Sequence, residues 1–141
     1  MRILAVDFGD ARTGIAVSDA MGLMAGETFV VREASMEKTA VRVCAEAARV
    51  SAGTIVVGNP KNMHGTVGER SQKAERLAAL IRGRCDVPVV LWDERLTTVA
   101  AHQILSDVGR RGRDRKNTVD AVAASLILEG YLGYLRNRGE S

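Results

Sequence analysis

The fold class of this chain follows from residues 3–18, ILAVDFGDARTGIAVS. The segment begins with a continuous apolar run, Ile3–Val6, which is typical of a central strand buried on both faces. Residues 9–12 then form a predicted turn, and residues 13–18 a second strand that pairs back antiparallel with the first. The sequence therefore predicts a sheet with its first strand in a central position.

Beyond this hairpin, the hydrophobic pattern predicts three more strands and four helices. The strands are expected at residues 27–32, 54–58 and 87–92, and the helices at residues 35–50, 67–82, 97–107 and 118–136. Ser35 is the expected N-cap of the first helix, and Thr66 and Glu69 have the spacing of a capping box before the second.

This order of elements places three antiparallel strands before parallel strands that are joined by right-handed helical crossovers. We therefore expect an α/β fold, a mixed five-stranded sheet with helices on both faces. The length of 141 residues predicts a single domain over residues 1–141, with a frayed tail at residues 136–141.

The composition argues against several classes of protein. Hydrophobic residues make up 46% of the chain and charged residues 26%, and no apolar run is long enough to span a bilayer or to act as a signal peptide. We therefore expect a cytoplasmic protein with no membrane partner. The two Cys and two His lie far apart, which argues against a zinc site, and neither GxSxG nor a Walker motif is present. These absences leave the carboxylates as candidates for chemistry.

Three acidic residues occupy positions where an acid is unexpected. Asp7 ends the first strand, Glu94 follows the last strand, and Asp120 shares a helix face with Ala124 and Ile127. Burying an unpaired carboxylate destabilises the folded state by roughly several kcal/mol. Because ligands bind α/β sheets at the carboxyl ends of parallel strands, we expect the three acids to converge there. Carboxylates suit Mg²⁺ or Mn²⁺, and such a site supports phosphodiester hydrolysis.

Each acid also has a simpler interpretation. Asp7 could cap the turn at residues 9–12 or pair with Arg12. Glu94, preceded by Asp93, could belong to an ordinary loop before a helix N-terminus. Asp120 could respond to the dipole of its own helix.

Basic residues near these acids are candidates for contact with a phosphate backbone. The net charge is +3, and residues 110–116 form a basic segment directly before the last helix. Arginine suits bidentate phosphate contact, although a solvated loop has the same composition. The loop at residues 59–65 leads into a helix N-terminus, where phosphates bind readily. The candidate substrate-binding residues are Arg12, Lys61, Asn62, Arg95, Arg113, Arg115 and Lys116.

Four segments, residues 7–19, 57–66, 93–98 and 119–124, together resemble the motifs of the bacterial YqgF-type family. Members of that family are named as pre-16S ribosomal RNA nucleases and as Holliday junction resolvases. The resemblance implies an RNase H-like fold, a cytoplasmic location and a role in maturing the 5′ end of 16S rRNA. It places the family's acidic site on Asp7, Glu94 and Asp120. The chain departs from the family pattern at Asn59, where an apolar residue is more usual, and at His64, where Asp or Asn is.

The sequence thus predicts a metal-dependent nuclease, a hydrolase that acts on ester bonds. Its partner is expected to be pre-rRNA, free or in a ribosomal precursor particle, or else branched DNA in recombination and repair. Two alternatives stay open. One is a non-catalytic RNA-binding assembly factor. The other is a nucleotide-binding module, because the first motif also resembles the phosphate-binding turn of sugar kinases, Hsp70 and actin. The sequence does not separate a monomer from a homodimer.

Overall fold

The computed structural model describes residues 1–60, 68–94 and 116–138, and the side chains of residues 116–120 lie outside this description. The strands are β1 (Arg2–Asp7), β2 (Thr13–Ser18), β3 (Ala25–Val31), β4 (Ala52–Asn59) and β5 (Val89–Asp93). The helices are α1 (Met36–Val50), α2 (Glu69–Arg82) and α4 (Lys116–Asn137). None of the helices in these ranges is both long and apolar enough to cross a membrane.

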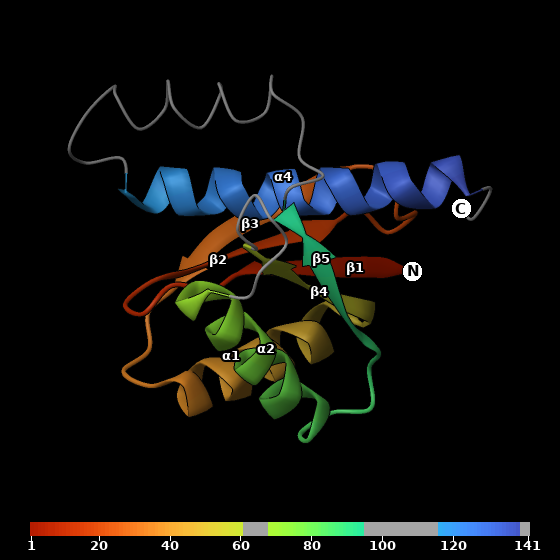
Figure 1. Ribbon diagram of the computed structural model, residues 1–141. Helices are drawn as coiled ribbons and strands as arrows, with labels where there is room; N and C mark the ends of the chain where they lie inside the picture. Colours follow the sequence, from red (N-terminus) through yellow and green to blue (C-terminus); the bar gives the residue numbers. More distant parts are fainter. Residues whose placement is uncertain (61–67, 95–115, 139–141) are drawn as a thin grey trace.

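The strands form one five-stranded sheet in the order β3-β2-β1-β4-β5. β1 pairs antiparallel with β2, and β2 antiparallel with β3. On its other side β1 pairs parallel with β4, and β4 parallel with β5. The predicted mixed sheet, with its first strand central, is confirmed (Figure 1).

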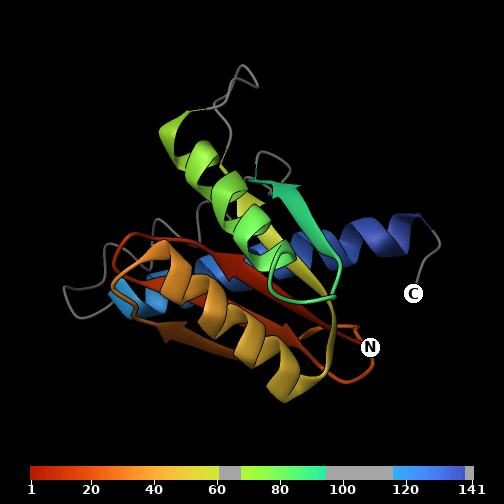
Figure 2. The same ribbon diagram turned by 90° about the horizontal axis from the view of Figure 1, so that it is seen from below.

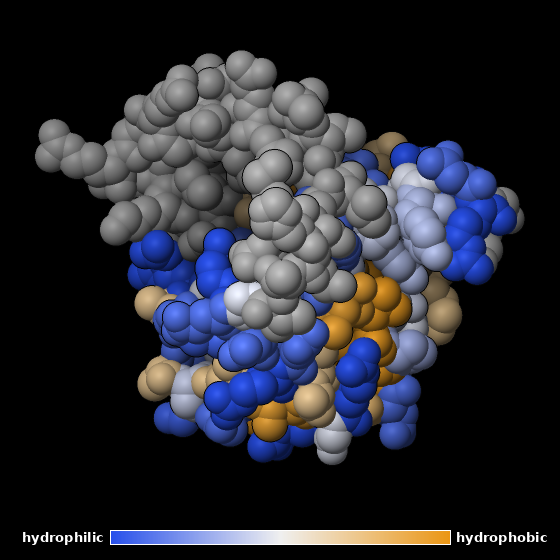
Figure 3. Space-filling view, viewed as in Figure 1, coloured by the Kyte–Doolittle hydropathy of each residue, from blue (hydrophilic) through white to orange (hydrophobic). Residues whose placement is uncertain are grey.

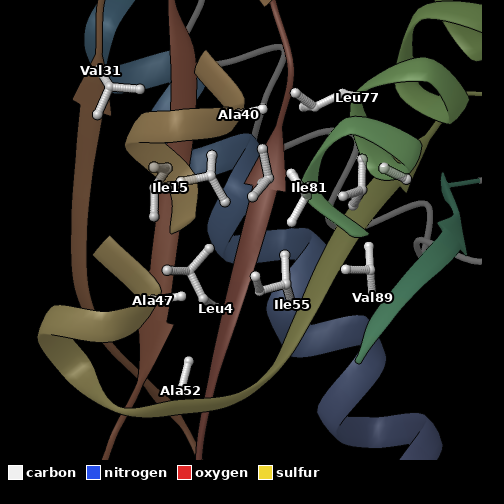
Figure 4. Packing of buried hydrophobic residues seen from close by; sticks show 14 of the residues in the cluster. Leu4, Ile15, Val31, Ala40, Ala47, Ala52, Ile55, Leu77, Ile81 and Val89 are labelled. Atoms are coloured by element: carbon white, nitrogen blue, oxygen red, sulfur yellow. The ribbon is translucent and has the colours of Figure 1, made fainter. Parts of the chain in front are cut away.

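Helices cover both faces of the sheet, as expected. Figures 1 and 2 show α1 and α2 on one face and the long helix α4 on the other. Alternate strand residues therefore belong to different cores. Leu4, Ile15 and Ile55 pack with Leu77 and Ile81 beneath α1 and α2 (Figure 4).

The second core lies between the sheet and α4. It contains Ile3, Ala5, Ala16, Val56, Trp92, Ala124, Ile127, Leu128 and Leu132. Because strand side chains alternate between faces, two neighbouring residues at a strand end are directed toward different helices. This alternation determines which side chains enter the candidate site.

Several element boundaries differ from those predicted. Ser35 caps α1 as expected and accepts a hydrogen bond from the Lys38 amide at 3.2 Å. The prediction that Thr66 caps the second helix is wrong, because α2 begins at Glu69 with Gly68 as its N-cap. Glu69 in the first turn instead supplies negative charge near the helix N-terminus. The helix predicted at residues 97–107 lies outside the described residues.

Strand β5 begins two residues later than predicted, at Val89. Pro88 has no amide hydrogen and cannot donate to the sheet. Its carbonyl accepts a hydrogen bond from the Ile55 amide at 2.9 Å. Figure 3 shows apolar side chains over this edge strand, where Val90 and Leu91 are half-buried, and a mostly hydrophilic surface over α2.

Candidate active site

The carboxyl ends of the three parallel strands lie side by side. In the sheet register Val6 lies opposite Val57, Gly58 opposite Trp92, and Asn59 opposite Asp93. The expected edge, formed by the carboxyl ends of strands β1, β4 and β5, is therefore present. It contains Asp7 at the end of β1 and Glu94 directly after β5.

Asp7 and Glu94 lie on the face of the sheet that α4 covers. Ile3 and Ala5 belong to the α4 core, and alternation along β1 places Asp7 on the same side. Glu94 is placed directly, because its Oε2 lies above Gly58 and beside Ile127 of α4. Both acids are half-buried. The structure thus brings two of the three predicted acids to one face of one edge.

Asp93 lies on the opposite side from its neighbour. Trp92 is buried against α4, so alternation directs Asp93 toward α2. Of the two adjacent acids, only Glu94 therefore lies on the face that α4 covers.

Asp120 is placed by its backbone alone. It lies in α4, one turn before Ala124 and about two turns before Ile127, and both of these residues are buried against the sheet. The N-terminal part of α4 lies at the same end of the molecule as the carboxyl end of β1 (Figure 1). Among the described side chains no three His, Cys, Asp or Glu residues form a cluster. The convergence of Asp120 with Asp7 and Glu94 stays a prediction.

Gly58 is the point where Glu94 and α4 come close to the sheet. A Cβ atom added at Gly58 would lie 3.0 Å from Glu94 Oε2 and 3.2 Å from Ile127 Cγ1, and it would overlap Ile127 Cδ1. The carboxylate and the isoleucine therefore occupy the space that a side chain at residue 58 would need.

The turn between β1 and β2 is tight, as the sequence predicts. A Cβ at Gly9 would overlap the carbonyl oxygen of Arg12, and Thr13 Oγ1 donates to the Gly9 carbonyl at 3.4 Å. Arg12 itself is half-buried in this turn. The other candidate substrate-binding residues are not placed: Lys61, Asn62, Arg95, Arg113 and Arg115 lie outside the described residues, as does the side chain of Lys116.

Two cations that the sequence analysis did not single out lie next to this turn. Arg70 and Lys73 of α2 line a cavity of about 120 Å³ together with Phe8, Gly9 and Asp10. Lys73 Nζ donates to both carboxylate oxygens of Asp10, at 2.9 and 3.1 Å, and this hydrogen bonding raises the pKa of Lys73. The spacing of Arg70 and Lys73, three residues apart at the start of a helix, was the available signal.

Asn59, a departure from the family pattern, has a clear structural partner. Its Oδ1 accepts a hydrogen bond from Ser71 Oγ of α2, and both residues are buried. Buried polar side chains are tolerated when they are hydrogen-bonded. The polar residue at the end of β4 therefore joins the strand to α2 on the face opposite Glu94.

Comparison with known proteins gives consistent results for family and fold. A family model described as "RuvX: Holliday junction resolvase" matches residues 1–134. A protein of Agathobacter rectalis is 43% identical over 140 residues, which cover 97% of this chain and 98% of the relative. A protein of Halothermothrix orenii is 39% identical over 135 residues, covering 95% and 96%. Both relatives carry the name "Putative pre-16S rRNA nuclease".

Solved structures show the same architecture at low sequence identity. Thermus thermophilus RuvC, in complex with a Holliday junction substrate, has a TM-score of 0.59 at 15% identity, covering 95% of this chain and 96% of that one. The fowlpox virus resolvase, in complex with Holliday junction DNA, has a TM-score of 0.58 at 15% identity, covering 96% and 99%. At this identity the likeness shows the fold alone, and it confirms the RNase H-like class.

Proposed function

The chain belongs to the RuvX family, and from that premise we propose that it is a metal-dependent nuclease that hydrolyses phosphodiester bonds in the 5′ region of pre-16S rRNA. The observation that carries the proposal is the placement of Asp7 and Glu94 on one face of the carboxyl edge, beneath α4. Curated relatives at about 40% identity, covering nearly the whole chain, supply the substrate class.

The acids at this edge fit a divalent cation. Carboxylate oxygens are hard ligands of the kind that Mg²⁺ and Mn²⁺ prefer. Asp7 and Glu94 are half-buried, and partial exclusion of water strengthens their attraction for a cation. Asp7 and Glu94 would hold the metal, with Asp120 as the proposed third ligand from α4.

A bound Mg²⁺ or Mn²⁺ would lower the pKa of the attacking water and offset the negative charge on the leaving oxygen. The protein contributes a rigid frame, because β1 and β5 belong to one hydrogen-bonded sheet and hold Asp7 and Glu94 in place. Two acids held at the ends of fixed strands need little rearrangement when substrate arrives.

Basic and amide side chains would contact the phosphate backbone of the substrate. From the sequence, the candidates are the basic residues Arg12, Lys61, Arg95, Arg113, Arg115 and Lys116 and the amide of Asn62. Arg70 and Lys73 extend this set onto α2, where they line the cavity beside the Gly9 turn. Such contacts supply affinity without reading sequence.

A second candidate function is the resolution of four-way DNA junctions. The description of the matched family favours it, and the same acids would serve it. A non-catalytic assembly factor that binds RNA is the third reading. If its substrate is pre-rRNA, free or in a ribosomal precursor particle, we propose that the protein acts in the cytoplasm. It would act there as a monomer or as a homodimer.

The test is cleavage of 5′-extended 16S rRNA beside a four-way DNA junction, each with Mg²⁺, with Mn²⁺ and with chelator. Wild type is compared with Asp7→Asn and with Asp86→Asn, a matched control at an exposed acid in the α2–β5 connection. Metal-dependent RNA cleavage by wild type and the control, lost in Asp7→Asn, supports the proposal. Cleavage of the DNA junction and not of the RNA would mean that the protein is a junction resolvase that uses the same acids. Absence of both would leave the assembly factor.

A further inference from the structure

Gly58 is a glycine for reasons of space and not of backbone conformation. Among the described glycines the left-handed backbone occurs at Gly22, whereas Gly58 lies within β4 in an extended conformation open to any residue. A glycine inside a strand is unfavourable, because it loses more entropy on folding and packs no side chain. Its presence at the end of β4 therefore calls for an explanation in its surroundings.

Those surroundings are Glu94, a proposed metal ligand, and α4, the helix that carries the third proposed ligand. A Cβ at Gly58 would come within 3.0 Å of Glu94 Oε2, at the limit of what Cβ atoms tolerate, and would overlap Ile127 Cδ1. Glu94 follows β5, and Ile127 belongs to α4. Two different elements therefore place a side chain in the space next to the Cα atom of Gly58. Ile127 is 1% exposed and belongs to the core between the sheet and α4, so other buried side chains surround it.

The contact at Ile127 also bears on Asp120. Asp120 lies seven residues earlier on α4, about 10.5 Å along the helix axis. A rigid helix that is lifted from the sheet at Ile127 also carries the backbone at Asp120 away from the sheet. A side chain at residue 58 would therefore displace Glu94 directly and the backbone at Asp120 through the helix.

We propose that Gly58 is a positioning residue of the metal site: the space left by its missing side chain lets the Glu94 carboxylate and α4 approach the end of β4 closely enough for one divalent cation to be shared. This rests on the proposed function, because it assigns Glu94 and Asp120 to a metal. A purely structural role, in which Gly58 only makes room for Ile127, is the competing explanation.

The two explanations separate in a double variant. Gly58→Ala adds the Cβ that meets both neighbours. Ile127→Val removes Cδ1, the atom that the new Cβ would overlap, and leaves the approach to Glu94 Oε2 unchanged. The combination Gly58→Ala with Ile127→Val therefore removes the overlap with Cδ1 of the helix, leaves the milder 3.2 Å contact with Cγ1, and keeps the 3.0 Å approach to the carboxylate.

Wild type, both single variants and the double variant are titrated with Mn²⁺ by isothermal calorimetry, and their melting temperatures are measured without metal. Gly83→Ala serves as control, because its added Cβ would meet neighbours at an ordinary 3.7 Å. We expect the double variant to melt near Ile127→Val yet to bind Mn²⁺ about ten-fold more weakly or worse. Wild-type Mn²⁺ affinity in the double variant would overturn the proposal and leave Gly58 a packing residue. If Asp7→Asn binds Mn²⁺ as wild type does, the proposed metal site itself fails, and the two failures are distinguishable.

Discussion

Ser71 of α2 donates a buried hydrogen bond to Asn59 at the end of β4, with the two residues 0% and 3% exposed. The neighbouring residue, Gly58, faces the other way and accommodates Glu94 and α4. Two consecutive residues thus anchor the same strand end to both helical layers. Asn59 is one of the two positions at which the chain departs from the family pattern, and the hydrogen bond explains why a polar residue is tolerated there.

The Asn59–Ser71 pair should behave as a unit in unfolding experiments. Ser71→Ala leaves Asn59 Oδ1 without this donor, and Asn59→Leu leaves the Ser71 hydroxyl without its acceptor. Each single change is expected to cost about 1–3 kcal/mol of unfolding free energy, because a buried polar group loses its partner. Combining the two changes should cost less than their sum, as measured by urea denaturation in a double-mutant cycle. Strict additivity would mean that the two side chains do not interact.

The face on which an acid lies, and not its position in the sequence, should decide its effect on cleavage. Glu94→Gln is expected to lower the rate constant of the cleavage step on the order of a hundred-fold or more, since the proposed site loses a metal-binding charge worth several kcal/mol. Asp93→Asn changes the adjacent acid, which alternation places on the α2 side, and should retain most of the activity. The check is single-turnover cleavage at saturating Mg²⁺ with matched thermal melts. Equal losses in the two variants would contradict the assignment of Glu94.

Removing the positive charge of Arg70 should weaken substrate binding and leave the rate constant of the cleavage step unchanged. Arg70→Ala is expected to raise KM for RNA and to reduce the slope of log affinity against log salt by roughly one, since one phosphate contact is lost. The control is Arg84→Ala, an exposed arginine in the α2–β5 connection, at the edge of the sheet opposite the acids. Fluorescence anisotropy across a salt series measures both variants. An unchanged slope in Arg70→Ala would remove the α2 cavity from the binding surface.

Cys44 should be inert toward alkylation at neutral pH. Burial, followed by its contact with Cys85, raises the pKa of the Cys44 thiol from 9.0 to about 11. Since the thiolate is the reactive form, iodoacetamide labelling followed by mass spectrometry should leave Cys44 largely unmodified at pH 8 in the folded protein. The Cys44 thiol loses its proton at lower pH in the unfolded chain than in the folded one. The contribution of the protonated thiol to the free energy of unfolding is therefore complete below the unfolded pKa, and it is lost as the pH rises from about 9 to about 11. Rapid labelling of folded Cys44 at pH 8 would contradict the assignment.

Local patterns in the sequence were sufficient for the order of elements, the mixed sheet with β1 at its centre, and the location of Asp7 and Glu94 at one edge. Each of these features depends on hydrophobic periodicity over a few residues and on the rule that the carboxyl ends of parallel strands share an edge. The start of α2 was predicted incorrectly, because a capping-box spacing was present at Thr66 while the helix begins after Gly68. Capping signals are short, and a nearby alternative is enough to displace them.

The contacts that complete the edge join residues that are distant in the sequence and follow no periodic pattern. Lys73 reaches Asp10 across 63 positions, and Asn59 reaches Ser71 across 12. The meeting of Glu94 and Ile127 over Gly58 depends on the height at which α4 packs on the sheet. The distance between α4 and the sheet is determined by how side chains of β4, α4 and the residue after β5 pack together next to Gly58. It therefore exists only after the chain has folded, and no local pattern in the sequence encodes it.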